Sequence, residues 1–300
     1  METPGVTADG YPVWGDQAEL VRLIDVRGDP TIPGRYVGPA HQTTGRNVVE
    51  GGQLLAQAIV AASKAVPAQR VTSAHMVFAK AASFDISVDV DVDVLRRGRT
   101  FSTAEVRTAQ NGQLRAVGMV LLDSGAADVI GSAVAMPDVP GPDDAVPLDM
   151  GVSGRQLRVV DAAYTAPPEA TGPAEIFVWT RFRDAPPAQH LHAALVAQST
   201  THWTIAAAMR PHPGYGEGAA HVTLSTGILA TTIALFDDID VSDWLLSSNT
   251  AIYAGRGLVQ GEGRVFTADG RLVASYSVQA MIRGFAHDPS TIGLDRSNAM

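Results

Sequence analysis

GGQLLAQAIVAAS, residues Gly51 to Ser63, is the stretch of sequence from which the fold can be argued. Four apolar residues share one face of this stretch at helical spacing: Leu54, Ala58, Ile59 and Ala62. That spacing predicts an amphipathic helix, and its small residues suit close packing against a β-sheet. Residues 188–210, AQHLHAALVAQSTTHWTIAAAMR, predict a second Ala-rich helix of the same kind.

Alternation of apolar and polar residues predicts antiparallel strands around these helices. In ISVDVDVDV, residues 86–94, valines alternate with Asp89, Asp91 and Asp93, which predicts a half-buried strand whose aspartates face water. A calcium loop would need Gly and Glu where Val94 and Thr100 stand, so the strand is favoured over a metal site. The expected strands are 71–79, 87–95, 102–110 and 114–122, and then 173–183, 220–236, 250–260, 262–267 and 271–284.

The two parts of the chain repeat one plan. Asn111-Gly112 and Asp269-Gly270 each lie between apolar-rich segments, a strong hairpin signal because both central residues of that turn adopt positive φ. This correspondence indicates an internal duplication. We therefore expect an α+β fold of two fused helix-on-antiparallel-sheet units. The expected boundaries are an N-terminal unit at 1–124, a Pro/Gly-rich linker at 125–168, a C-terminal unit at 169–288 and a tail at 289–300.

Composition limits the classes of function. The 300 residues carry 22 Lys and Arg against 31 Asp and Glu, a formal net charge of -9, which argues weakly against a nucleic-acid partner. The chain has no cysteine, which excludes disulfides, thiol catalysis and thiolate metal sites. The N-terminal residues do not have the pattern of a signal peptide, and no apolar run is long enough for a membrane helix. We expect a cytoplasmic protein with no membrane span and no bound metal.

Short motifs occur in a fixed order in each half. They are Gly51-Gly52-Gln53, Ser73-x-His75-x-x-Phe78, Leu95-Arg96-Arg97-Gly98-Arg99 and Gln110-Asn111-Gly112, and then Asp243-Trp244-Leu245-Leu246, Gly255-Arg256-Gly257, Asp269-Gly270-Arg271 and Ile282-Arg283. In this order the motifs resemble the type II acyl-CoA thioesterases, a family of two fused hot-dog units. The resemblance implies a double hot-dog fold.

The resemblance also implies a catalytic Asp, Thr and Gln, and this chain departs from all three. The Asp falls on Thr200, the Thr falls on Ile228 and the Gln falls on Val278, with Gln279 one residue late. Thr231 replaces a polar residue that lies just beyond the family's Thr. Thr200 cannot act as a base near neutral pH, and Gln279 reaches the site only if a β-bulge shifts it.

Other residues could replace the missing groups. Glu50, at the start of the first helix, could be a base beside free helix N–H groups, or merely an acid favoured by the helix dipole. His202 could be a base one helical turn from Thr200, or could simply pack on the sheet. The cluster of Arg96, Arg97 and Arg99 could bind the phosphates of coenzyme A, or be a solvated turn.

The resulting hypothesis is an acyl-CoA thioesterase-like protein of fatty acid metabolism that hydrolyses or binds fatty acyl-CoA in an apolar channel beside a long helix. Coenzyme A would enter only as part of the substrate, with no other cofactor. The alternative is a catalytically inactive acyl-CoA or acyl-carrier binding protein of the same fold, and an acyl-CoA hydratase ranks third. We also expect self-association into at least a dimer, because exposed sheet faces and edges favour it.

Overall fold

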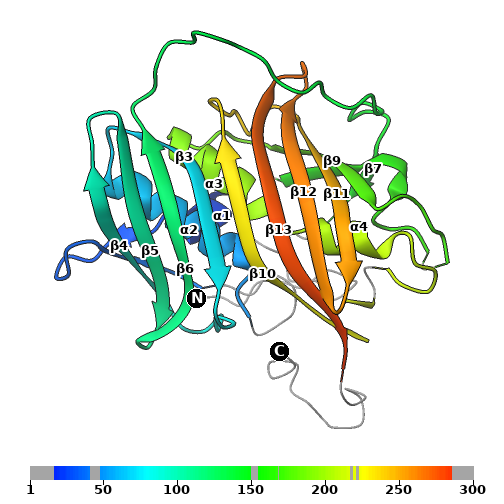
Figure 1. Cartoon of the computed structure of the whole chain (residues 1–300), viewed down its shortest axis with the longest axis horizontal. Coiled ribbons are helices and arrows are strands. Elements are labelled where there is room, and N and C mark those ends of the chain that lie inside the picture. Colours follow the sequence, from blue (N-terminus) through cyan, green and yellow to red (C-terminus); the bar gives the residue numbers. More distant parts are fainter. Residues whose placement is uncertain are drawn as a thin grey trace.

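The computed structural model describes residues 17–40, 48–149, 155–167, 169–216, 219–220 and 223–285. These residues form one 13-stranded sheet in the order β1-β2-β4-β5-β6-β3-β10-β13-β12-β11-β9-β8-β7, and every neighbouring pair of strands is antiparallel. Helices cover one face of this sheet (Figure 1). The double hot-dog arrangement predicted from the sequence is confirmed.

The first half contributes six strands and two helices. They are α1 (Gln17–Ile24), β1 (Arg27–Gly28), β2 (Arg35–Gly38), α2 (Gly51–Ala65), β3 (Arg70–Phe78), β4 (Val88–Arg97), β5 (Phe101–Gln110) and β6 (Gln113–Asp123). The predicted alternation in β4 is confirmed, because Val88, Val90 and Val92 are buried while Asp93 is exposed. At the β5–β6 turn Asn111 and Gly112 both have positive φ, as the sequence predicted.

In the second half of the chain, three strands and a 3₁₀ turn precede the long helix. Its elements are β7 (Val146–Leu148), β8 (Arg155–Val159), the 3₁₀ turn η1 (Val160–Ala162), β9 (Glu175–Phe182), α3 (Gln189–Ser199), α4 (Thr204–Met209), β10 (Leu224–Leu235), β11 (Leu245–Gly255), β12 (Leu258–Thr267) and β13 (Leu272–Gly284). At the β12–β13 turn only Gly270 has positive φ, so this hairpin is wider than the sequence predicted.

The helix predicted over 188–210 is wrong in one respect: it is two helices. Helix α3 ends at Ser199 and α4 begins at Thr204. The break contains Thr200 and Thr201, whose β-branched side chains are poor helix formers. The Thr200 hydroxyl donates to the carbonyl of Ala197 at 2.8 Å, which competes with continuation of the helix.

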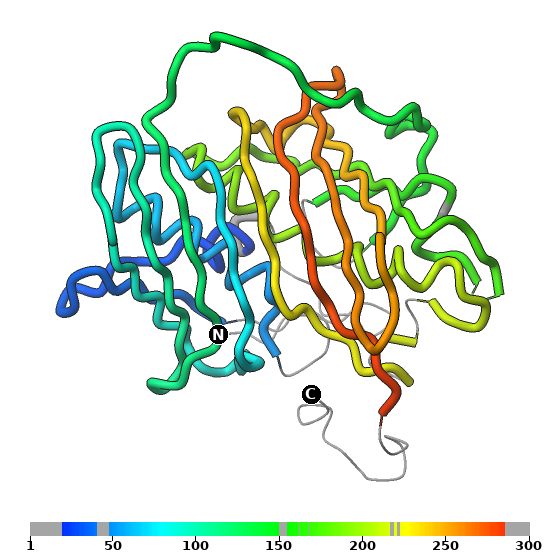
Figure 2. The backbone as a smooth tube through the Cα atoms, viewed as in Figure 1, coloured from blue at the N-terminus to red at the C-terminus, as the bar shows by residue number. Residues whose placement is uncertain are grey.

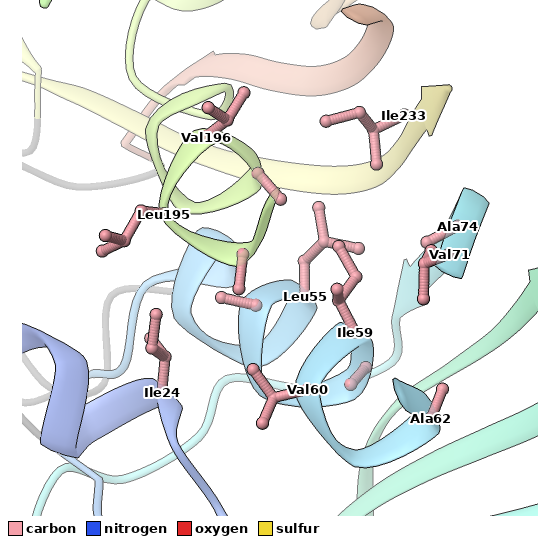
Figure 3. Close-up of a cluster of buried hydrophobic side chains, with 14 of the residues drawn as sticks. Ile24, Leu55, Ile59, Val60, Ala62, Val71, Ala74, Leu195, Val196 and Ile233 are labelled. Atoms are coloured by element: carbon pink, nitrogen blue, oxygen red, sulfur yellow. The ribbon is translucent and has the colours of Figure 1, made fainter. Parts of the chain in front are cut away.

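The two halves join through β3 and β10, at the centre of the sheet (Figure 1). Pairs such as Met76 with Thr231 and Ala74 with Ile233 form this junction. Beneath it lies the main apolar cluster, in which Leu55 and Ile59 of α2, Val196 of α3 and Ile233 of β10 come together (Figure 3). Because the same cluster contains side chains from both halves, they form one packed core.

The segment predicted as a linker contains β7 and β8, which extend the sheet beyond β9. Before β7 the chain passes over one end of the sheet (Figure 2). There Met136, Val139 and Ala145 pack on Trp179, and the Trp179 indole N–H donates to the carbonyl of Pro140 at 2.9 Å. The boundaries proposed for the four segments stay a prediction. No helix in the described ranges is long and apolar enough to cross a membrane.

Candidate active site

The N-terminus of α2 meets the C-terminus of α3. A Cβ atom on Gly52 would lie 2.3 Å from the carbonyl oxygen of Gln198 and 2.8 Å from Oγ1 of Thr201. Only glycine permits this approach, so the paired glycines bring the first turn of α2 against the break between α3 and α4. Here the two halves of the chain place polar side chains next to one another.

Glu50 and His202 are brought together at this contact. His202 Nε2 lies 3.3 Å from Glu50 Oε2, and the Gln198 side-chain amide donates to the same oxygen at 3.1 Å. The Glu50 side chain is 19% exposed and the His202 side chain 6%, so water reaches the carboxylate while the imidazole is held in the protein. The sequence proposed the two residues separately; the structure pairs them across the duplication.

Arg155 extends this cluster from β8. Its Nη1 donates to Gln198 Oε1 at 3.4 Å, so Gln198 connects the guanidinium with the Glu50 carboxylate. Burial lowers the pKa of Arg155 to about 10, against the opposing effect of the negative charge of Glu50. The sequence analysis missed Arg155 because it lies in the segment predicted as a linker. It also missed Gln198, which looked like one polar residue of an amphipathic helix.

Aromatic rings support the imidazole. The Trp203 ring lies 5.8 Å from the His202 ring and 5.4 Å from the Tyr164 ring, both edge-on. His202 Nδ1 is buried and has no hydrogen-bond partner among the described residues. The packing fixes the position of the ring, and Nδ1 is left available to a ligand or water.

These groups can carry out proton transfer. A carboxylate or an imidazole can take a proton from water, and here the two groups lie within contact distance of each other. In the first turn of α2 the N–H groups of Gln53 and Leu54 donate to the carbonyl of Glu50, whereas those of Gly51 and Gly52 have no partner within the helix and could polarise a carbonyl oxygen. The site therefore contains a base and hydrogen-bond donors within one helical turn.

Thr200 and Thr231 are buried but are not placed against Glu50 by any described contact. The hydroxyl of Thr200 is committed to Ala197, as noted above. Thr231 points to the helix-covered side of the sheet between Met76 and Val278, and its Oγ1 has no partner among the described residues. A catalytic role for either residue stays a prediction.

Gln279 does not join the site. It is exposed, whereas its neighbours Val278 and Ala280 are buried on the helix side. The β-bulge in this region lies in β10, between Ile228 and Ala230, and β13 alternates regularly from Ala274 to Ala280. The bulge is therefore on the neighbouring strand and does not turn Gln279 inwards, and a catalytic role for Gln279 stays a prediction.

Arg96, Arg97 and Arg99 lie at the far end of α2. The Arg97 guanidinium donates to the carbonyl of Ala65, the last residue of this helix, at 2.9 Å. Fifteen helical residues span about 21 Å, so the arginines and Glu50 lie at opposite ends of the molecule's longest helix. The predicted binding of phosphate by these arginines therefore belongs to a different region from the Glu50 site.

Two family models cover most of the chain. The N-terminal domain of acyl-CoA thioesterases matches residues 39–122, and the C-terminal domain matches residues 132–282. The chain belongs to the acyl-CoA thioesterase family. Acyl-CoA thioesterase 2 of Haemophilus influenzae is 26% identical over 267 residues, which are 81% of this chain and 90% of that protein.

Solved structures agree on the fold. The acyl-CoA thioesterase II TesB2 of Mycobacterium marinum superposes with a TM-score of 0.74 at 24% identity, covering 88% of this chain and 98% of that one. The tesB protein of Mycobacterium avium subsp. paratuberculosis gives 0.73 at 21% identity, covering 88% and 98%. The recognition of an acyl-CoA thioesterase-like double hot-dog from sequence motifs is thus confirmed.

Proposed function

We propose that this acyl-CoA thioesterase family member hydrolyses acyl-CoA thioesters at the junction of α2 and α3, with Glu50 as the general base. The observation that carries the proposal is the 3.3 Å contact between Glu50 and His202 at the start of α2. Thr200 supplies no carboxylate where the family resemblance implies one, and Glu50 supplies one at the same junction of α2 and α3. Glu50 also remains partly open to water.

In the proposed reaction a water molecule donates its proton to Glu50 and its oxygen attacks the thioester carbonyl carbon. The negative charge that forms on the carbonyl oxygen is stabilised by the N–H groups of Gly51 and Gly52 at the start of α2. The C–S bond then breaks, and the leaving thiolate takes a proton from the Glu50–His202 pair. The products are a carboxylic acid and coenzyme A. All proton carriers in this scheme belong to the chain, so no further cofactor is proposed.

Gln198 and Arg155 have positioning roles in this scheme. Gln198 holds Oε2 of Glu50 through its amide, and the nearby guanidinium of Arg155 favours the ionised form of the carboxylate. A base must be ionised to accept a proton, so a buried cation close to Glu50 keeps it competent.

We further propose a fatty acyl substrate, a cytoplasmic location and a self-associated protein. The absence of cysteine fits a reducing compartment. Val77, Met119 and Leu121 are exposed on adjacent strands of the sheet face opposite the helices, and a second copy could cover them.

A second candidate is a binding protein that retains the fold without hydrolysis. The observation in its favour is that Ile228 and Val278 are apolar where the resemblance implies a catalytic Thr and Gln. Such a protein would hold acyl-CoA or an acyl carrier and release it unchanged.

Release of free thiol from acyl-CoAs of several chain lengths separates the two functions. The wild type should release thiol above the buffer blank, and Glu50→Gln should lower the rate by about 10²- to 10⁴-fold. Glu262→Gln is the matched control, because Glu262 is exposed on β12. Saturable binding of acyl-CoA by calorimetry without any thiol release would establish the binding protein instead.

A further inference from the structure

A cavity of about 520 Å³ lies at the other end of the α2–α3 pair. One wall is the C-terminal end of α2 with the start of β3, and the other is the start of α3 with the end of β10. Its apolar floor includes Val71, Leu235 and Ile239. The proposed hydrolysis does not use this cavity.

The cavity is the counterpart of the Glu50 site in the duplicated fold. Because α2 and α3 run in opposite directions, the start of α3 meets the end of α2 there. Counted from the first residue of each helix, Lys64 in α2 has the position that His202 has after α3. Ala188 precedes α3 as Glu50 precedes α2. The counterpart site therefore has a cation and lacks the carboxylate base.

A basic turn adjoins this cavity. Gln69, which lines it, donates through Nε2 to the carbonyl oxygens of Gly98 and Thr100, both at 3.1 Å. The backbone N–H of Ser124, another lining residue, donates to Thr100 O at 2.9 Å. The turn held in this way carries the exposed side chains of Arg96, Arg97 and Arg99. It is a dense basic cluster on a chain whose net charge is -9.

Acidic residues also line the cavity and restrict its ligand. Asp237 forms an ion pair with Arg271, which together with the N–H of Asp238 lowers its pKa. Asp123 Oδ1 is buried and has no hydrogen-bond partner among the described residues, so it can accept a hydrogen bond from a ligand. The body of the ligand must therefore be a neutral hydrogen-bond donor, and any anionic part must lie at the arginine turn.

We propose that this cavity binds the coenzyme A portion of a second molecule and does not hydrolyse it. The phosphates would bind Arg96, Arg97 and Arg99, whose planar guanidinium groups match phosphate oxygens. The neutral amide chain of coenzyme A would lie over the apolar floor, with an amide N–H donated to Asp123. With Ala188 in place of Glu50 and Lys64 in place of His202, a thioester bound here lacks the carboxylate–imidazole pair of the other end. This inference goes beyond the proposed hydrolysis and does not depend on it.

The test is calorimetric titration of the full-length protein with free coenzyme A and with pantetheine, which lacks the phosphates. The double variant Arg96→Ala/Arg99→Ala should weaken coenzyme A binding at least tenfold and leave pantetheine binding unchanged. These side chains are exposed, so folding should be unaffected. Arg264→Ala, which removes an exposed arginine from β12, is the matched control and should bind as the wild type does.

A second readout locates the ligand. His190 lines the cavity, so its ring resonances should shift in NMR spectra as coenzyme A is added. Ala193→Trp, which fills the cavity, should abolish that shift. The proposal is overturned if pantetheine binds as tightly as coenzyme A, if the double variant binds as the wild type does, or if His190 does not respond. Because the probe is free coenzyme A, this test of binding gives an answer whether or not the protein hydrolyses acyl-CoA.

Discussion

At one end of the α2–α3 pair Glu50 lies 3.3 Å from His202, whereas at the other end Ala188 and Lys64 occupy the equivalent places. Both ends have the same backbone plan, a helix start against the end of a second helix. The two ends differ in a few side chains. One end has the Glu50 carboxylate and the His202 imidazole, and the other has Lys64 beside the turn that carries the three arginines. The duplicated fold supplies two similar clefts, and the side chains decide which of them can do chemistry.

Moving the carboxylate from one end to the other tests this difference most severely. In Glu50→Ala/Ala188→Glu the carboxylate would face Lys64, away from His202. We expect thiol release to stay about 10²- to 10⁴-fold below the wild type, because the relocated base lacks the imidazole. Recovery of wild-type rates in the thiol assay would mean that either end can hydrolyse the substrate.

Removal of the imidazole should have the next largest effect. His202→Gln keeps a hydrogen-bonding side chain next to Glu50 but cannot carry a proton, so we expect about a 10²-fold loss of thiol release. His212→Gln is the matched control, because His212 is exposed beyond α4. Equal rates for the two variants would remove His202 from the reaction.

The close contact between Gly52 and the Gln198 carbonyl should be disturbed by one added methyl group. Gly52→Ala places a Cβ against the Gln198 carbonyl, so we expect the free energy of unfolding in urea to fall by about 1–3 kcal/mol. Gly141→Ala should change it by less than about 0.5 kcal/mol, because a Cβ there meets nothing within 4 Å. Similar effects at both glycines would show that α2 and α3 do not need this approach.

Thr231 is buried in β10, and replacing it distinguishes a structural role of its side chain from a catalytic one. Its hydroxyl has no partner among the described residues, so Thr231→Val should leave the free energy of unfolding unchanged or raise it by up to about 1 kcal/mol. Thr108→Val should lower it, because the Thr108 hydroxyl donates to the Ala116 carbonyl. A large loss of thiol release in Thr231→Val, with stability kept, would instead place Thr231 in the reaction.

The smallest expected effect is a change in one pKa at the Lys64 end. Burial lowers the pKa of His190, the charge of Lys64 lowers it further and Asp25 raises it. Lys64→Met should therefore raise this pKa and Asp25→Asn should lower it, as followed by NMR titration of the ring. Shifts of the opposite sign would contradict the positions of Lys64 and Asp25 near His190 in the structure.

Much of the fold could be predicted from short-range patterns. The valine alternation of β4 and the Asn111-Gly112 turn depend on local geometry, so the sequence alone was sufficient for them. The break at Thr200 was harder, because helix propensity is weak next to the apolar periodicity around it. Strands β7 and β8 were missed because the segment is rich in Pro and Gly and its pairing depends on distant residues: β8 pairs with β9, and β7 pairs with β8.

The site was predicted residue by residue but not as a set. Glu50 and His202 were both proposed, yet their contact depends on Gly52 fitting against Gln198, which no local pattern reveals. The position of the bulge in β10, which leaves Gln279 exposed, could not be predicted because a bulge leaves no clear mark in a single sequence.

A crystal structure of the Glu50→Gln variant with a bound acyl-CoA tests the central claim most directly. We expect the thioester carbonyl at the start of α2, with its carbon about 3–3.5 Å from a water that contacts the side chain at position 50. A thioester seated against Thr200 and Val278, out of reach of that side chain, would contradict it.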